Sequence, residues 1–291
     1  MHQQLRIPFV FSHESAALVW GCAVWPTPTR THIIQADRPN RRGDPQLVRH
    51  HGLPPSNERT VVAGLPVTTL ERTVIDCAAA IAPDRALVIA DGALRRGADR
   101  DRMVRLMDLR AGHRGIRRAR LVVELADAGA ESPGESLTRW VLASAGFDAV
   151  KTQVPVVTRL GVFRIDLGLV AARLAIEFDG FVKYSGALGS TAPEAVFAEK
   201  RRQDALEEAG WMVLRVTWSD LRDPDALVRR VRSACRRAAQ RQGAESLPKP
   251  GSRPSRRPGP SESRDVGLSP VARTREGPRD LGRPSVARTR P

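Results

Sequence analysis

The order of helix and strand patterns between residues 131 and 240 is the feature that most constrains the fold. A helix is predicted over 132–146, where Ser132 suits the N-cap, Pro133 the first helical position and Gly146 the end. An αβββαβα order follows, with three strands ("TQVPVVTRL", "VFRIDLGLV", "RLAIEFDG"), a helix over 191–210, a strand over 211–218 and a helix from about 224 to 240. A crossover helix that leads into another strand predicts a mixed sheet with helices on its faces.

Residues 1–125 are predicted to form a smaller, mainly helical α+β domain. A short helix ("HESAALVWG"), two strands ("THIIQA", "TVVAG") and a strand followed by two helices (65–97) are expected there, with Pro83 separating the two helices. The arginine-rich segment 112–126 is predicted to be a helix that packs with its arginines in solvent. A helix that contacts DNA is the alternative.

The C-terminal residues 241–291 differ from the rest in composition. They hold 12 Lys and Arg against 5 Asp and Glu, contain no aromatic residue, and repeat the sequence "VARTR". Such a segment cannot bury enough apolar surface to fold alone. We therefore predict a disordered basic tail that touches nucleic acid nonspecifically, with a solvated extension of no function as the alternative.

The charge and cysteine content restrict the location and the partners. The net charge is +15, which suggests a polyanionic partner such as DNA. No apolar run reaches the roughly 18 residues that span a bilayer, so no membrane partner is expected. The three cysteines, an odd number, are far apart in the sequence. This pattern is typical of a reduced, cytoplasmic protein.

The segment "AIEFDGFVKYSG" (175–186) places Glu177 and Asp179 on one face of a strand. If it forms a hairpin with "FRIDLGL", centred between residues 171 and 172, Asp166 lies opposite Glu177. Three carboxylates so close repel one another unless a cation lies between them. Mg²⁺ (or Mn²⁺) prefers such oxygen ligands and activates water for phosphodiester hydrolysis. The predicted metal ligands are Asp166, Glu177 and Asp179, and the alternative is an exposed, ordinarily charged sheet face with Asp179 as a turn residue.

Three further residues complete the predicted site. Lys183 follows the turn and could stabilise charge on a phosphate, although a solvated loop lysine explains it equally. Lys200 lies on the helix predicted over 191–210, beside an arc that mixes apolar and polar residues. Glu135 completes a capping box with Ser132, and it could also reach the metal site.

These motifs resemble a known family. "RIDLGLVAARLAIEFDGFVKYSG" followed by "AEKRRQDALEEAGWMVLRVTWSDL" resembles the very-short-patch-repair-like endonuclease domains of the PD-(D/E)XK superfamily. The resemblance covers residues 131–237 and implies a restriction-endonuclease-like αβββαβ core in a domain over 126–240. It assigns Asp166 and Glu177 to the metal-ligand positions and Glu135 to the first-helix acidic position. Asp179 stands where the superfamily has lysine, so Lys183 or Lys200 is expected to supply that cation.

The first region resembles abortive-infection-type antitoxins through "GLPVTTLERTVIDCA" and "ADGALRRG". Together the resemblances imply a metal-dependent DNA endonuclease that acts in phage defence or DNA repair. The alternative is a non-catalytic, DNA-binding or antitoxin-like regulator that retains a nuclease fold. A homodimer and a toxin partner remain open.

Overall fold

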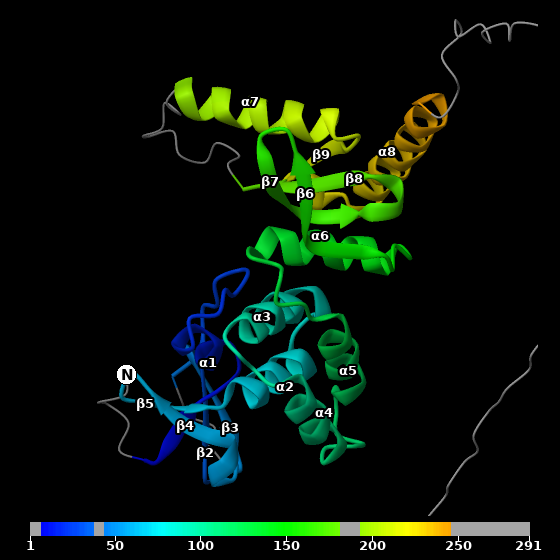
Figure 1. The fold of residues 1–291 in the computed structure, drawn as a ribbon. Helices are drawn as coiled ribbons and strands as arrows, with labels where there is room; N and C mark the ends of the chain where they lie inside the picture. Colours follow the sequence, from blue (N-terminus) through cyan, green and yellow to red (C-terminus); the bar gives the residue numbers. More distant parts are fainter. Residues whose placement is uncertain (1–6, 38–43, 181–192, 246–291) are drawn as a thin grey trace, which may run out of the picture. The chain divides into compact units, whose positions relative to one another are not determined.

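The computed structural model describes residues 7–37, 44–180 and 193–245, with only the backbone of 193–196 and 243–245. All of these residues belong to one compact unit. The described part is a mixed α/β structure with two mixed sheets and eight α-helices (Figure 1). No helix in it is long and apolar enough to cross a bilayer.

The first sheet has five strands in the order β3-β2-β1-β5-β4. Its elements are β1 (Phe9–Phe11), α1 (His13–Val19), β2 (Thr31–Gln35), β3 (Leu47–His51), η1 (Ser56–Glu58), β4 (Arg59–Val62) and β5 (Leu65–Thr68). The predicted elements at α1, β2, β4 and β5 are confirmed. The strands β1 and β3 were not predicted, because a three-residue strand and a strand ending in Arg-His-His show little periodicity.

Four helices follow this sheet and pack around their own apolar core. They are α2 (Leu70–Ala80), α3 (Pro83–Arg95), α4 (Arg100–Asp108) and α5 (Ile116–Leu125). The predicted break at Pro83 is confirmed, since Pro83 is the first residue of α3. In α5, Ile116 and Val122 are buried while Arg117 and Arg118 are exposed, as expected for a packed helix with solvated arginines. Leu121 of the same helix is exposed.

Gly115 gives the first testable prediction. It lies at the N-cap of α5 with φ +85°, and a Cβ there would overlap the backbone of Ala79 in α2. We expect Gly115→Ala to lower the free energy of unfolding by at least about 2 kcal/mol, because strain and overlap add. Gly112→Ala is the matched control, since its φ is +83° but nothing lies within 4 Å of the new Cβ. Equal urea midpoints for the two variants would contradict the overlap.

The second sheet has four strands in the order β6-β7-β8-β9, with β8 and β9 parallel and the other pairs antiparallel. Its elements are α6 (Pro133–Ser144), β6 (Val150–Thr158), β7 (Gly161–Leu169), β8 (Leu174–Asp179), α7 (Pro193–Glu208), β9 (Met212–Thr217) and α8 (Pro224–Glu245). The predicted order and the mixed sheet are confirmed. Apolar residues of α6 and α8 pack in one core cluster with the sheet, and Leu206 of α7 packs in another (Figure 1).

Local signals set the ends of these helices. Ser132 Oγ accepts a hydrogen bond from Glu135 N (3.2 Å), which confirms the predicted N-cap of α6. The helix α8 continues to Glu245, past the predicted end at residue 240, because Gln, Ala and Glu in this stretch favour helix. Within the described residues the three cysteines are free thiols. The predicted tail from residue 246 onward lies outside the described residues.

Candidate functional site

The hairpin of β7 and β8 brings two predicted carboxylates together. Leu167 lies opposite Ile176 in this antiparallel pair, which confirms the register that we predicted. The same register, continued by one residue, places Asp166 opposite Glu177. The strands are joined by a short 3-10 turn, η2 (Val170–Ala172). The local turn therefore decides which carboxylates meet.

Asp166 lies where the two strands stop pairing. Its Oδ2 accepts a hydrogen bond from the backbone N–H of Phe178 at 3.0 Å, so a side chain satisfies a donor of the neighbouring strand. Near this point Ile165 packs in a cluster with Ala175, whereas Leu167 packs in another. The side chains of β7 therefore stop alternating regularly here, and the pairing with β8 begins at Leu167, next to the carboxylate.

Glu177 is buried and is held by an arginine from α7. Arg202 Nη1 donates to Glu177 Oε2 at 3.0 Å, and Arg202 Nη2 lies 2.6 Å from Oε1. Nη2, however, makes its hydrogen bond to the backbone oxygen of Arg164 (3.1 Å). Glu177 Oε1 is therefore buried beside a positive charge but accepts no well-directed hydrogen bond. Such an unsatisfied buried oxygen is costly unless a ligand completes it.

The carboxylates line a small polar cavity of about 210 Å³. The described lining holds two guanidinium groups and four carboxylates. Glu199 of α7 pairs with Arg215 of β9 and lies 3.5 Å from Arg202. The lining residues are Asp166, Glu177, Phe178, Asp179, Glu199, Arg202 and Arg215.

Burial raises the pKa of two carboxyl groups in this domain. Burial raises the pKa of Asp166, the hydrogen bond from Phe178 opposes this rise, and the nearby charge of Glu177 adds to it. Burial likewise raises the pKa of Glu135, and the charge of Asp166 contributes to the increase. Both shifts favour the protonated acid, as expected for buried carboxyl groups that have another carboxylate nearby.

Glu135 takes part in capping α6, which was one of the two roles that we predicted for it. Its Oε2 accepts a hydrogen bond from the backbone N–H of Glu131 at 2.8 Å, and its own N–H donates to Ser132. The side chain is buried in the first turn of α6. Capping therefore accounts for Glu135, although its charge is also coupled to that of Asp166.

The remaining predicted residues are placed differently. Asp179 is half-buried and lines the same cavity as Asp166 and Glu177. Among the described residues, however, these three carboxylates do not form a group whose ligand atoms all lie within 4.8 Å of one another. Lys200 is exposed on α7 and is not among the lining residues. Lys183 lies outside the described residues. Among the described lining residues, the cations are arginines.

Three of the lining residues, Glu199 and Arg202 of α7 and Arg215 of β9, were not among the predicted site residues. Arg202 and Glu199 belong to the quoted segment "AEKRRQDALEEAG", in which we singled out Lys200. Arg202 lies three residues after Glu199, so both occupy the same side of α7. That spacing is the signal that could have identified Arg202. The contribution of Arg215 depends on the parallel pairing of β8 with β9, where it lies opposite Glu177.

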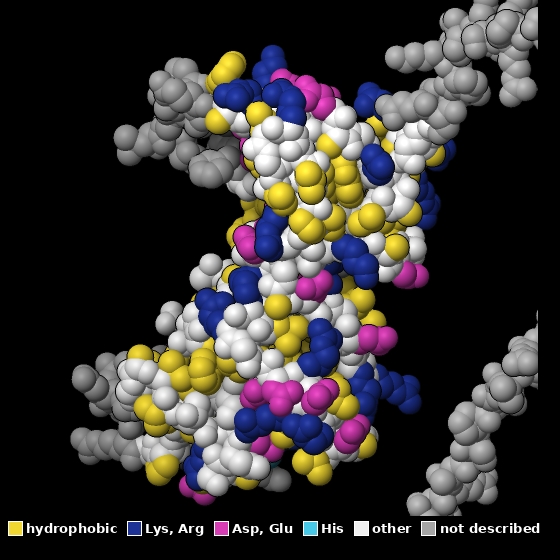
Figure 2. Space-filling model, in the orientation of Figure 1, with side chains coloured by type: hydrophobic (Ala, Val, Ile, Leu, Met, Phe, Trp, Pro, Cys, Tyr) yellow, Lys and Arg dark blue, Asp and Glu magenta, His cyan; other side chains and the backbone are white. Residues whose placement is uncertain are grey.

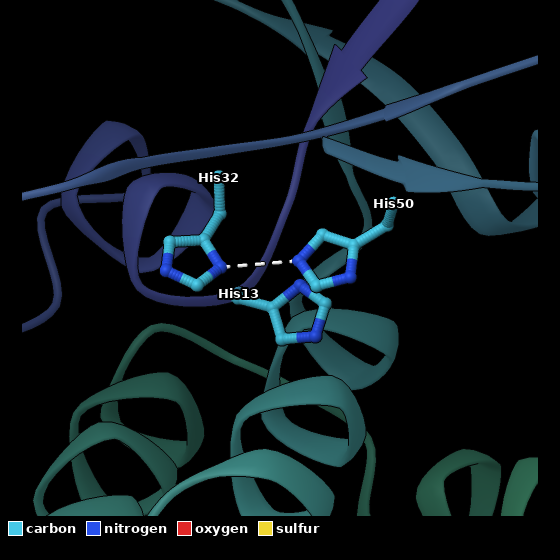
Figure 3. A group of neighbouring side chains, drawn as sticks. All are labelled: His13, His32 and His50. Atoms are coloured by element: carbon cyan, nitrogen blue, oxygen red, sulfur yellow. Dashed lines mark hydrogen bonds between the residues drawn. The ribbon is translucent and has the colours of Figure 1, made fainter. Parts of the chain in front are cut away.

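A second group of ligand-type side chains lies in the first sheet. Figure 3 shows His13, His32 and His50 with their rings directed toward one another. One ligand atom from each lies within 4.8 Å of the others. No metal motif marks them in the sequence, because they are 18 and 19 residues apart.

Comparisons with known proteins identify relatives without an assigned activity. Two uncharacterized proteins of Mycobacterium tuberculosis, MT2308 and Rv2248, are each 30% identical to this chain over 173 residues. The match covers 58% of this chain and 62% of each relative, so the chain spans less than two thirds of their length. No family model and no solved structure matches the chain.

Proposed function

We propose that this protein is a metal-dependent DNA endonuclease with a restriction-endonuclease-like core formed by α6, β6, β7, β8, α7 and β9. The observation that carries the proposal is the meeting of Asp166 and Glu177 in a polar cavity at the point where β7 and β8 separate. The αβββαβ order of the elements also supports it. The test is Mg²⁺-dependent cleavage of plasmid DNA that EDTA suppresses.

The donor set of the cavity fits a hard divalent cation. Asp166 and Glu177 supply carboxylate oxygens, which Mg²⁺ and Mn²⁺ prefer, and Asp179 is a third candidate. Glu177 Oε1 is buried without a hydrogen bond, and the pKa of Asp166 is raised by burial and by Glu177. A bound cation relieves both penalties and, in phosphodiester hydrolysis, supplies an activated water and stabilises the leaving oxygen.

The protein's own side chains provide binding and charge. Arg202 and Arg215 are directed into the cavity, where guanidinium groups can hold a phosphate oxygen. The helix α8 presents one face of exposed arginines and buries Leu227, Val231 and Ala234 on the other. Phosphate contacts from such side chains give sequence-independent affinity for DNA. Figure 2 shows that the basic side chains of the visible face are dispersed among acidic ones.

A non-catalytic DNA-binding regulator is the second candidate. It is favoured by the arginine that already neutralises Glu177 and by Asp179 at the usual lysine position. Salt-dependent DNA binding without Mg²⁺ or Mn²⁺ binding would support this alternative.

Arg202 provides a prediction that separates the two functions. In Arg202→Met the Glu177 carboxylate loses its partner, and in EDTA we expect the free energy of unfolding to fall by about 2 kcal/mol, less than for a fully buried pair. If Glu177 holds a cation, Mn²⁺ will raise the melting temperature more in Arg202→Met than in wild type. Arg159→Met removes an exposed pair with Glu208 and is the control. Identical Mn²⁺ shifts in wild type and Arg202→Met would contradict a cation at Glu177.

A further inference from the structure

Three histidines from three separate elements meet on one side of the first sheet. His13 is the first residue of α1, His32 lies in β2 and His50 in β3. The parallel register places Ile34 opposite His50, so His32 and His50 are diagonal neighbours on the same face. Backbone contacts hold α1 against β2, since Ser12 N donates to His32 O at 3.1 Å.

The nitrogen atoms are spaced as metal ligands are. His32 Nδ1 and His50 Nε2 lie 3.1 Å apart (Figure 3). Two imidazole nitrogens bound to one tetrahedral Zn²⁺ at about 2.0–2.1 Å are about 3.3 Å apart. The His13 ring stacks on the His50 ring, with centroids 4.0 Å apart, and its ligand atom completes a set within 4.8 Å. The His13 and His50 rings are stacked at an interplanar angle of 15°, so one of them must rotate out of the stack for all three nitrogens to face one ion.

The three rings are at least half-buried. Burial lowers the pKa of all three histidines, and the pKa of His32 falls to about 4. Glu14 Oε2 lies 3.8 Å from His32 Nε2, the ring nitrogen remote from His50. This distance is longer than a hydrogen bond, so Glu14 becomes an outer partner of His32 only if the two side chains move closer when an ion binds.

The backbone at His13 is also unusual. Its φ of +49° lies in the left-handed region, which non-glycine residues rarely adopt. This conformation has a free-energy cost, and contacts with the surrounding residues must offset it. His13 Nδ1 lies 3.0 Å from Ser12 Oγ, and this contact sets the direction of the ring. The strained residue is thus the one whose side chain closes the group. Strain held at such a position is a recognised mark of a functional site.

We propose that His13, His32 and His50 form a binding site for a divalent transition-metal ion of the Zn²⁺ class. Three histidine ligands leave a fourth position for water or another ligand. Imidazole nitrogens select Zn²⁺-type ions, whereas the oxygen ligands of the carboxylate cavity suit Mg²⁺ or Mn²⁺. The site joins the start of α1 to β2 and β3, and it does not depend on the proposed nuclease activity.

The test uses the untagged, full-length protein after removal of metals with a chelator. Calorimetric titration with Zn²⁺ should show a site that His32→Ala and His50→Ala each weaken at least about 100-fold, because loss of an outer-shell partner alone costs about 10–100-fold. Glu14→Gln should weaken it about 10-fold. Titration with Co²⁺ should produce the intense visible absorption of a four-coordinate ion in wild type, and this absorption should be lost in the two His variants.

Two control variants test whether Zn²⁺ binds to these three histidines and not to other side chains of the protein. His51→Ala alters the adjacent, exposed histidine of β3 and should leave Zn²⁺ affinity unchanged. Glu177→Gln should also leave it unchanged, since Glu177 belongs to the carboxylate cavity. Circular dichroism checks that each variant is folded. If a histidine variant does not fold, the expected loss of Zn²⁺ affinity in Glu14→Gln is the test in its place. Binding that survives in His32→Ala and His50→Ala, or no four-coordinate Co²⁺ spectrum in wild type, would overturn the proposal.

Discussion

Asp166→Asn is expected to reduce Mg²⁺-dependent cleavage of plasmid DNA by at least about 1000-fold. Asparagine retains an oxygen that can accept the Phe178 N–H, so the backbone near the end of β8 should be preserved. The substitution removes the negative charge that would hold the cation. The ion contributes several kcal/mol to the transition state, and each 1.36 kcal/mol corresponds to a tenfold change in rate.

Glu177→Gln is the companion variant, and its loss should be of similar size because both carboxylates face one cavity. Asp204→Asn is the control, since Asp204 is exposed on α7 and does not line the cavity. Initial rates of supercoiled-plasmid nicking, with Mg²⁺, Mn²⁺ or EDTA, provide the measurement. Cleavage that persists in EDTA, or equal cleavage by wild type and Asp166→Asn, would sink the endonuclease proposal.

Asp91→Ala is expected to be the most destabilising of these substitutions, lowering the free energy of unfolding by about 3–5 kcal/mol. Arg139 Nη2 lies 2.6 and 2.7 Å from the two oxygens of Asp91, and both side chains are at least nine-tenths buried. Asp91 also accepts the backbone N–H of Asp127 at 2.8 Å. Removal of the carboxylate leaves a buried guanidinium without its counter-charge, and this accounts for the size of the effect.

Two comparisons test that explanation. Asp108→Ala breaks a similar ion pair with Arg120 on the surface and should change stability by less than about 1 kcal/mol. The double variant Asp91→Leu/Arg139→Met removes both charges and should recover part of the loss. Urea denaturation of wild type and of the three variants gives the four free energies of unfolding. A loss in Asp91→Ala no greater than in Asp108→Ala would show that burial does not strengthen this pair.

Much of the carboxylate site could be predicted because its signals are local. The turn between β7 and β8 fixes their register, and the register places Asp166 opposite Glu177. The carboxylates lie within β7 and β8, the two central strands of the sheet, so the pairing of these strands brings them together. The partner of Glu177 was missed, since Arg202 lies 25 residues away on a helix whose rotation depends on packing.

Lys200 illustrates the same limit. It is two residues before Arg202, and helix geometry places the two on different sides of α7. A motif match alone favoured the lysine, whereas burial of Leu206 and Ala205 decides which side of α7 faces the sheet. The arginine therefore reaches the cavity and the lysine is exposed.

By itself the sequence determined the element order of the second sheet and the cap of α6, because neighbouring residues control both. The hairpin register was an assumption that the strand pairing confirms. The tertiary structure alone decided the Asp91–Arg139 pair, the arginine at Glu177 and the histidine group. The histidines meet because β2 pairs in parallel with β3 and because His13 adopts a left-handed backbone conformation. Such contacts join residues far apart in the chain, and their free energy depends on burial, which no local pattern specifies.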